Sequence, residues 1–257
     1  MDRAREKGDY KEMSSYRFNP HKLLNRDKVW LMTHFCKCGH TYMEHPACFH
    51  HDYADGKIPD CPVTEKIGFL DIENSNLSAP FGYVISWAIM DMQSEEVFGD
   101  VITPEEIQRE SKSNLDDIVA IDKRILKSFS ECADKFDKLI VYWGKNRRHD
   151  IPFLRHRCLR LDIPFPLYGT TFCVDLFDWV RNMLKMGWGR NSLFAVCNEF
   201  GIEAKGTKCP AFYWVKAGTG NQKAIDTIFQ HNKEDVICLK PLYQMLDQFA
   251  RRVRTSL

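Results

Sequence analysis

Two carboxylates follow an apolar segment near residue 70. In the stretch KIGFLDIENSN, residues 66–76, Ile67 to Leu70 predict a buried strand that continues into Asp71 and Glu73. Since side chains alternate along a strand, both carboxylates point to the same face. Like charges this close repel each other and raise each other's pKa unless a positive charge neutralises them. The pair therefore needs a positive partner, unless these acids merely end a surface strand.

Acids at two other places could join this pair. In KLIVYWGKNRRHDIPFLRHR, a predicted strand at 138–143 leads into a polar turn, and Asp150 lies just before an apolar helix. An acid at this place could also be only the N-cap of the helix. In IFQHNKEDVICLKPLY, His231 and Asp235 lie one turn apart on one face of a predicted helix. A solvated helical pair is the alternative there, so each group taken alone is ambiguous.

Taken together and in this order, the three motifs resemble the DEDD superfamily of 3′–5′ exonucleases, which has the ribonuclease H-like fold. The resemblance covers about residues 65–250, and the stretch RNSLFAVCNEFGIEAKG is similar to the helix and basic turn of polymerase-associated exonuclease domains. It extends to uncharacterised archaeal, bacterial and phage exonuclease-like proteins that carry a Cys/His segment ahead of the domain. The resemblance implies an α/β fold, in which helices flank a ribonuclease H-like mixed β-sheet.

The resemblance also implies a role for each of these residues. Four carboxylates would be catalytic ligands of two Mg²⁺ or Mn²⁺ ions, which prefer hard oxygen donors. These ligands are Asp71, Glu73, Asp150 and Asp235. His231 would be the general base or would orient the attacking water. It lies four residues before Asp235, as the tyrosine does in the tyrosine branch of the superfamily, whereas the histidine branch uses a spacing of five.

We therefore expect an enzyme, a hydrolase that releases nucleotides from the 3′ end of nucleic acid by a two-metal mechanism. We favour single-stranded DNA over RNA as the substrate, although the sequence does not decide between them. A structure-specific RNase H-like endonuclease and a non-catalytic module that binds nucleic acid or protein are the alternatives. The sequence also leaves the preferred metal, the oligomeric state and the biological pathway open.

Basic and polar residues surround the turn before Asp150, where substrate phosphates would have to approach the metals. The residues that we expect to bind substrate are Lys145, Asn146, Arg147 and Arg148. Three arginines continue the cluster along the helix, where a solvated face paired with surface acids is the alternative. These are Arg155, Arg157 and Arg160. Three aromatic residues could stack on unpaired bases. These are Tyr142, Trp143 and Trp188.

The N-terminal part of the chain is dense in Cys and His, as in the stretch FCKCGHTYMEHPACFHHDYADGKIPDC. Zinc needs four soft or borderline ligands in a tetrahedral arrangement, and ligand pairs close in sequence reduce the entropy of closing the site. We expect one structural Zn²⁺ held by two such pairs. The predicted ligands are Cys36, Cys38, His45 and Cys48. Four residues compete for these places, and a loop without metal is the alternative. The competitors are His40, His50, His51 and Cys61.

Length and composition place these motifs in a chain of ordinary globular character. The 257 residues are 44% hydrophobic and carry a formal net charge of +1, so no global field would attract nucleic acid. No apolar stretch is long enough to span a bilayer, so we expect a soluble, intracellular (cytoplasmic) protein without a membrane partner. We divide the chain into a charged arm at 1–28, a small zinc-binding module at 29–64 and the exonuclease domain at 65–257.

Strand-like and helix-like patterns alternate after residue 65, which favours a mixed sheet with helices packed on it. We expect strands near 67–72, 82–91, 95–101, 138–143 and 171–174, and helices near 115–135, from about 151, and near 175–186, 191–200 and 222–250. Asp175, which follows the last strand, is expected just behind the candidate site. Five single cysteines in these patterns should pack as small hydrophobes. They are Cys132, Cys158, Cys173, Cys197 and Cys238.

Overall fold

The computed structural model describes residues 65–111, 120–145, 148–166, 171–187, 191–203 and 207–250. All of them belong to the unit Glu65–Leu257. The predicted arm at 1–28 and the predicted zinc-binding module at 29–64 lie outside the described residues. The individual predicted residues that lie outside them are Cys36, Cys38, His45, Cys48, Asn146, Arg147 and Trp188.

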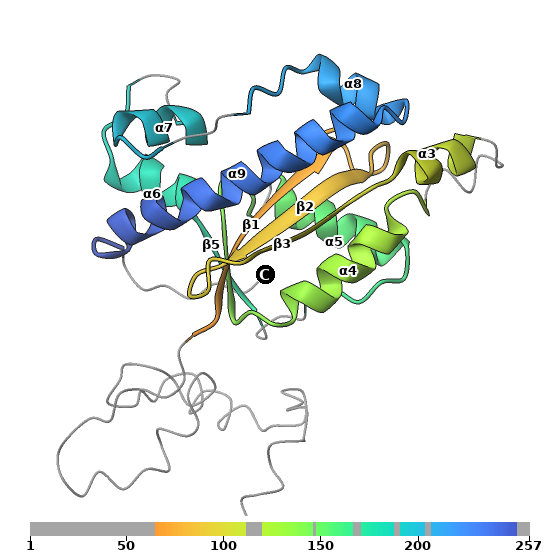
Figure 1. The fold of residues 1–257 in the computed structure, drawn as a ribbon. Coiled ribbons are helices and arrows are strands. Elements are labelled where there is room, and N and C mark those ends of the chain that lie inside the picture. The colour runs from red at the N-terminus through yellow and green to blue at the C-terminus, as the bar shows by residue number, and fades with distance from the viewer. Residues whose placement is uncertain are drawn as a thin grey trace, which may run out of the picture. The chain divides into compact units, whose positions relative to one another are not determined.

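Five strands form one mixed sheet in the order β3-β2-β1-β4-β5 (Figure 1). They are β1 (Ile67–Asn74), β2 (Val84–Asp91), β3 (Val97–Val101), β4 (Lys138–Val141) and β5 (Phe172–Asp175). The first three strands pair antiparallel, whereas β4 pairs parallel with β1 and β5 pairs parallel with β4. Strand β1 is therefore central in the sheet and has a partner on both sides.

Helices cover both faces of this sheet. In the described residues they are α3 (Pro104–Ser111), α4 (Lys123–Ala133), α5 (Asp150–Arg160), α6 (Leu176–Met183), α7 (Leu193–Glu199), α8 (Phe212–Gly218) and α9 (Gln222–Asp247). The long helix α9 crosses the sheet on one face, and α4 and α5 lie on the other (Figure 1). Among the described residues, no helix combines the length and apolar character needed to cross a lipid bilayer.

Strand β1 contributes to the hydrophobic core on both sides of the sheet. Phe69 is buried in the cluster that contains the second half of α9, whereas Leu70 and Ile72 are buried in the cluster that contains α4 and α5. Because side chains alternate along a strand, Asp71 and Glu73 follow Phe69 to the face that α9 covers. The alternation thus directs both carboxylates toward the longest helix.

The predicted α/β fold, a mixed sheet flanked by helices, is confirmed. The strands lie close to the predicted ranges, and α9 ends three residues before the predicted 250. Helix α4 begins at Lys123, and residues 112–119 of the helix predicted near 115–135 lie outside the described part. The sequence does not predict α3 and α8, because helices of seven or eight residues depend on tertiary packing rather than on a long periodic pattern.

Single cysteines pack in the core of this fold as small hydrophobes, as predicted. Five of them are buried, and none of these forms a disulfide with another described residue: Cys132, Cys158, Cys173, Cys197 and Cys238.

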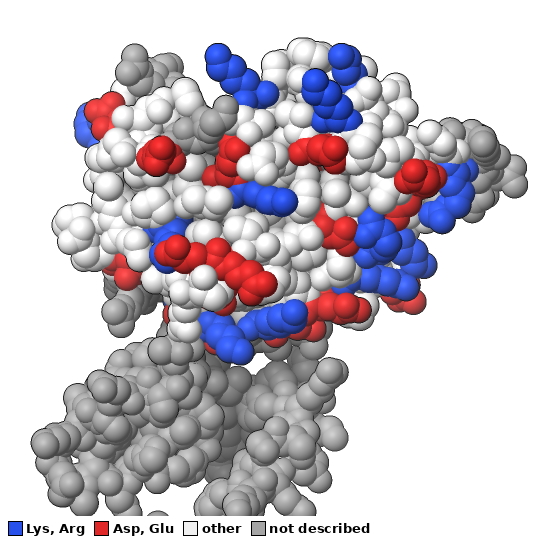
Figure 2. Space-filling model, in the orientation of Figure 1, with Lys and Arg blue, Asp and Glu red and all other residues white. Residues whose placement is uncertain are grey.

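Charged side chains of both signs are interspersed on the face drawn in Figure 2, over the part of the chain that is described. This mixture agrees with the formal net charge of +1. Attraction of a polyanion to this face would therefore depend on local groups rather than on a broad positive field.

Candidate active site

The site forms where β1 extends beyond its parallel neighbour. The pairing of β1 with β4 ends at Phe69 and Ile140. Strand β4 ends one residue later, and the chain turns into α5, which begins at Asp150. Parallel strands point their carboxyl ends to the same edge of a sheet, which is where α/β proteins bind ligands. Asp71 and Glu73 therefore lie on the part of β1 that faces this turn.

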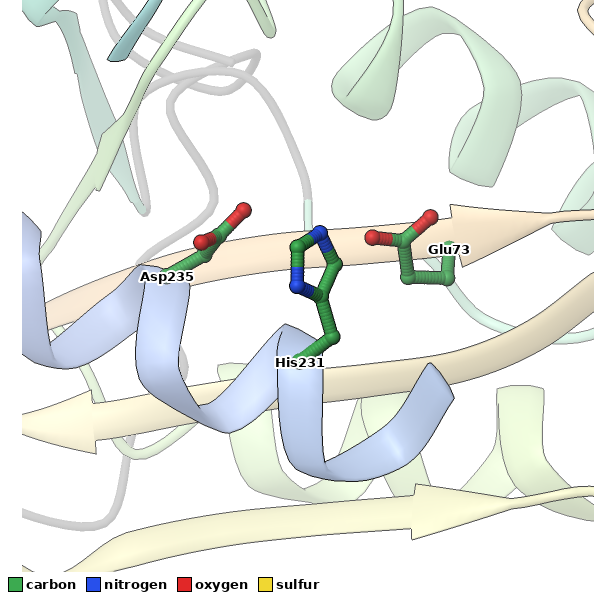
Figure 3. Close-up of side chains that lie close together, drawn as sticks. All are labelled: Glu73, His231 and Asp235. Atoms are coloured by element: carbon green, nitrogen blue, oxygen red, sulfur yellow. The ribbon is translucent and has the colours of Figure 1, made fainter. Parts of the chain in front are cut away.

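Helix α9 brings an imidazole and a third carboxylate to β1 (Figure 3). One ligand atom from each of Glu73, His231 and Asp235 lies within 4.8 Å of the other two. The imidazole of His231 lies between the two carboxylates in Figure 3. Two carboxylates and an imidazole at this spacing form a donor set that can hold a divalent cation. Strand β1 and helix α9 thus bring together three of the predicted catalytic residues.

Asp71 lies beside this cluster and is held by α9. Asn232 Nδ2 donates to Asp71 Oδ2 over 2.6 Å, and Asn232 is fully buried. Such a hydrogen bond fixes the orientation of a carboxylate that serves as a metal ligand. Asn232 is not predicted from the sequence, although helical spacing places it on the buried face with Ile228 and Val236. A buried asparagine implies a hydrogen-bond partner, so this spacing was a usable signal.

Trp214 of α8 holds the second carboxylate of β1. Its Nε1 donates to Glu73 Oε2 over 3.2 Å. The Trp214 ring also meets the His231 ring edge-on, with centroids 6.3 Å apart. Trp214 lies 141 residues from Glu73 along the chain, and no sequence motif predicts this contact.

Asp150 adds a buried charge of the same sign. It is 5% exposed, and its Oδ2 has no hydrogen-bond partner among the described residues. Burial raises the pKa of Asp150 well above its ordinary value, and the negative charges of Asp71, Asp175 and Glu73 raise it further. Asp150 is not the N-cap of α5, because the N-cap residue is His149 and no side-chain cap bond forms. The alternative that limited Asp150 to helix capping is therefore wrong.

Gly144 allows the turn to approach this carboxylate. A Cβ atom at Gly144 would lie 2.6 Å from Asp150 Oδ2 and 2.8 Å from Val141 Cβ, closer than real Cβ atoms come to such neighbours. The Ile151 amide donates to Gly144 O over 2.8 Å, which joins the turn to the start of α5. A glycine is therefore needed where the backbone passes the carboxylate.

Asp175 organises the same turn. Its Oδ1 accepts from Trp143 N over 2.9 Å and from Phe177 N over 3.0 Å. Its Oδ2 accepts from Lys145 N over 3.0 Å and from Arg148 Nη1 over 2.6 Å. Backbone and guanidinium donors thus balance this carboxylate. Asp175 lies behind the cluster, as predicted, and braces the turn that leads into α5.

A family model described as the RNase H superfamily matches residues 68–247. The chain belongs to the RNase H superfamily. Among solved structures, the nuclease domain of 3'hExo, a DEDDh family member, bound to rAMP, is similar with 13% sequence identity and a TM-score of 0.46. That similarity covers 76% of this chain and 99% of the other. No curated protein matches the chain.

Two of the predicted substrate contacts, Lys145 and Arg148, lie in the described part of this RNase H superfamily domain. Both side chains bind other groups of the protein. Lys145 is 7% exposed, its Nζ donates to Cys173 O over 2.5 Å, and burial lowers its pKa. Arg148 pairs with Asp175 and with Asp178. Both side chains brace the turn before α5, and their binding to substrate stays a prediction.

Arg157 is not part of a substrate surface, and that prediction is wrong. Arg157 is 2% exposed, and its Nε and Nη2 donate to Asp122 over 2.9 and 2.6 Å. Asp122 is fully buried and also accepts from Val84 N over 2.9 Å. The other two arginines of α5 also contact the protein, since Arg155 lies over a phenylalanine ring and Arg160 donates to a backbone carbonyl. Arg157 therefore belongs to the buried core, where it neutralises the charge of Asp122.

Proposed function

We propose that this chain is a metal-dependent 3′–5′ exonuclease that hydrolyses phosphodiester bonds of nucleic acid. The observation that carries the proposal is the gathering of Glu73, His231 and Asp235 beside the buried carboxyl of Asp150. A buried carboxyl whose pKa is raised by burial and by neighbouring acids, as that of Asp150 is, is stabilised in its charged form when a cation binds beside it. Membership of the RNase H superfamily and the order of the three motifs support the proposal.

The residues of this site fit divalent cations. The ligands would be Asp71, Glu73, Asp150 and Asp235, with His231 close enough to join them. Bound Mg²⁺ or Mn²⁺ would stabilise the attacking and leaving oxygens of an in-line displacement at phosphorus. Asn232 and Trp214 each orient one carboxylate of β1 beforehand. Less conformational freedom is then lost when a cation binds, which favours binding.

His231 has two candidate roles, because its ring lies between carboxylates. As a general base it would accept the proton of the attacking water, and as a ligand it would bind a cation through a ring nitrogen. His231→Ala separates the two roles. Loss of a base lowers the rate by about 10²–10⁴ at saturating metal, and His231→Tyr should recover part of it. Loss of a ligand raises the metal concentration that is needed for activity, and the rate recovers at high Mn²⁺.

The test of the proposed function is Mn²⁺-dependent degradation of 5′-labelled and 3′-labelled single strands, with DNA and RNA in parallel. We expect products shortened from the 3′ end. Asp235→Asn should abolish them while the protein stays folded. Asp226→Asn makes the same change at an exposed position of the same helix and should keep full activity. Internal cuts would favour the endonuclease alternative, and binding without cleavage would favour a non-catalytic module.

A further inference from the structure

Trp143, at the rim of the candidate site, has a backbone conformation that bulky residues rarely adopt. Its φ is 59°, in the left-handed region where any residue other than glycine is strained. The turn holds it there, because Trp143 N donates to Asp175 Oδ1 and Lys145 N donates to Asp175 Oδ2. Strain of this kind persists only where the surrounding structure enforces it, and it is frequent at ligand contacts.

The side chain of Trp143 is half exposed in spite of this enforced position. Trp143 is 48% exposed, and its ring stacks on the imidazole of His149 with centroids 6.3 Å apart and an angle of 21° between the planes. His149 in turn contacts the ring of Phe153, and the Asn74 side-chain amide donates to His149 Nε2. The two rings form a stack that is anchored in the protein at His149 and ends at the indole.

This stack lies between the end of β1 and the start of α5, which both carry candidate ligands. Asn74, which binds His149, directly follows Glu73 on β1. His149 directly precedes Asp150 at the start of α5. A nucleotide whose phosphate lies at the carboxylates would therefore bring a base within reach of the indole.

The other predicted aromatic contact near the turn does not offer such a surface. Tyr142 is 9% exposed, and its hydroxyl donates to Asn191 O over 2.6 Å. Its ring packs edge-on against Phe177. Of the predicted aromatic residues that the structure describes, Trp143 alone is half exposed at the site.

We propose that Trp143, backed by His149, is a stacking subsite for one unpaired nucleobase of the substrate. The inference rests on the proposed function and narrows its substrate class to strand ends whose bases are unpaired. An indole stacks on any base, because every base has a π face, so the subsite selects unpaired bases without selecting a sequence. A base inside a duplex is already stacked and must first leave its neighbours. If Trp143 merely covers His149, its removal has no effect that depends on a base.

The test removes the base and the indole separately and together. Single strands with one abasic nucleotide, placed in turn at each of the positions nearest the 3′ end, are bound to Asp235→Asn protein and to Asp235→Asn/Trp143→Ala protein in Mn²⁺. Binding is measured through the fluorescence anisotropy of a fluorophore at the 5′ end of the strand. At one position, we expect loss of the base to weaken binding about tenfold when Trp143 is present and hardly at all when it is alanine. Trp143→Phe should keep part of the difference.

Two further variants serve as controls, one for misfolding and one for removal of an exposed aromatic ring elsewhere. Trp143→Gly fits the left-handed backbone, so it should stay folded and still lose the dependence on the base. Phe194→Ala removes an aromatic side chain that is 56% exposed on α7, and it should keep the dependence. Equal effects of the abasic nucleotide with and without Trp143, at every position, would overturn the subsite.

The same experiment distinguishes failure of the subsite from failure of the proposed function. Degradation from the 3′ end by the wild type, without coupling between base and indole, rejects the subsite alone. Coupling without any degradation keeps the subsite and rejects the exonuclease. Absence of both binding and degradation rejects both proposals.

Discussion

Helix α5 connects two buried acidic sites that differ in how their charge is balanced. At its start, Asp150 is 5% exposed, and its Oδ2 has no hydrogen-bond partner among the described residues. About two turns later, Arg157 is 2% exposed and pairs with the fully buried Asp122. Burial of a charge is costly unless the charge is paired and hydrogen-bonded. Donors of the protein meet this condition at both oxygens of Asp122, whereas among the described residues no donor meets it at Asp150 Oδ2.

Under the proposed function, the difference separates an acid that is balanced within the fold from an acid that is arranged for a ligand. Asp122 accepts from two guanidinium nitrogens and a backbone amide. Asp150 faces the like charges of Asp71 and Glu73, which help to raise its pKa. Such an arrangement destabilises the folded chain until a cation completes it, and perturbed carboxyls of this kind are frequent at functional sites.

The largest expected effect is on stability, where the same substitution should destabilise the protein at one site and not at the other. Asp122→Asn leaves the buried guanidinium of Arg157 without a counter-charge and should lower the free energy of unfolding by about 3–5 kcal/mol. Asp150→Asn removes a repulsive charge and should not lower it. Urea unfolding of the metal-free protein measures both values. Equal losses at the two positions would break the distinction between a balanced and an unbalanced acid.

A smaller effect is expected from the donors that orient the unbalanced site. Trp214→Phe keeps a ring beside His231 but removes the N–H that binds Glu73. Loss of such a supporting hydrogen bond typically weakens metal binding by about 10- to 100-fold. Trp179→Phe is the matched control, because it makes the same change at a tryptophan whose ring stacks on Tyr243. The affinity is measured by titration with Mn²⁺, in which the electron paramagnetic resonance signal reports the concentration of the free ion. Unchanged affinity in Trp214→Phe would show that the hydrogen bond does not position the ligand.

The sequence predicts the acids of the site better than the groups that support them. Asp71 and Glu73 continue the alternation of a buried strand, so their common face follows from local geometry. Trp214 belongs to a seven-residue helix, and only the packing of α8 on α9 brings it to Glu73. Long-range packing of this kind leaves no periodic pattern in the chain. The arrangement of the candidate acids could therefore be predicted in outline, and the donors that support them could not.

Arg157 shows a second limit of prediction from sequence. Arginine is usually exposed, so a cluster of arginines on one helix indicates a solvated or phosphate-binding face. Arg157 lies three and four residues after the buried Leu154 and Phe153, and this helical spacing indicates a buried position instead. Its partner Asp122 precedes α4 and belongs to no motif, so only the packing of α4 and α5 on the same face brings the two together.

The smallest expected effect is a pH dependence of stability that belongs to Asp150. Burial and neighbouring charges raise the pKa of Asp150 in the folded protein, so the folded state binds this proton more tightly than the unfolded state. Below the unfolded value of about 3.9 both states hold the proton, and Asp150→Asn should match the wild type. As the pH rises through the raised pKa of the folded state, the wild type loses stability that the asparagine variant keeps.

Thermal unfolding of the metal-free proteins from pH 4 to pH 8 measures this difference. The midpoint of Asp150→Asn should rise relative to the wild type with increasing pH, by about 2–4 °C for each kcal/mol gained. Added Mn²⁺ should reverse the order at neutral pH, because a cation that binds the folded state stabilises the wild type and finds one ligand charge fewer in the variant. A constant difference across the pH range, unaffected by Mn²⁺, would mean that the Asp150 carboxyl is already balanced within the protein. The contrast with Asp122 would then reflect packing rather than charge.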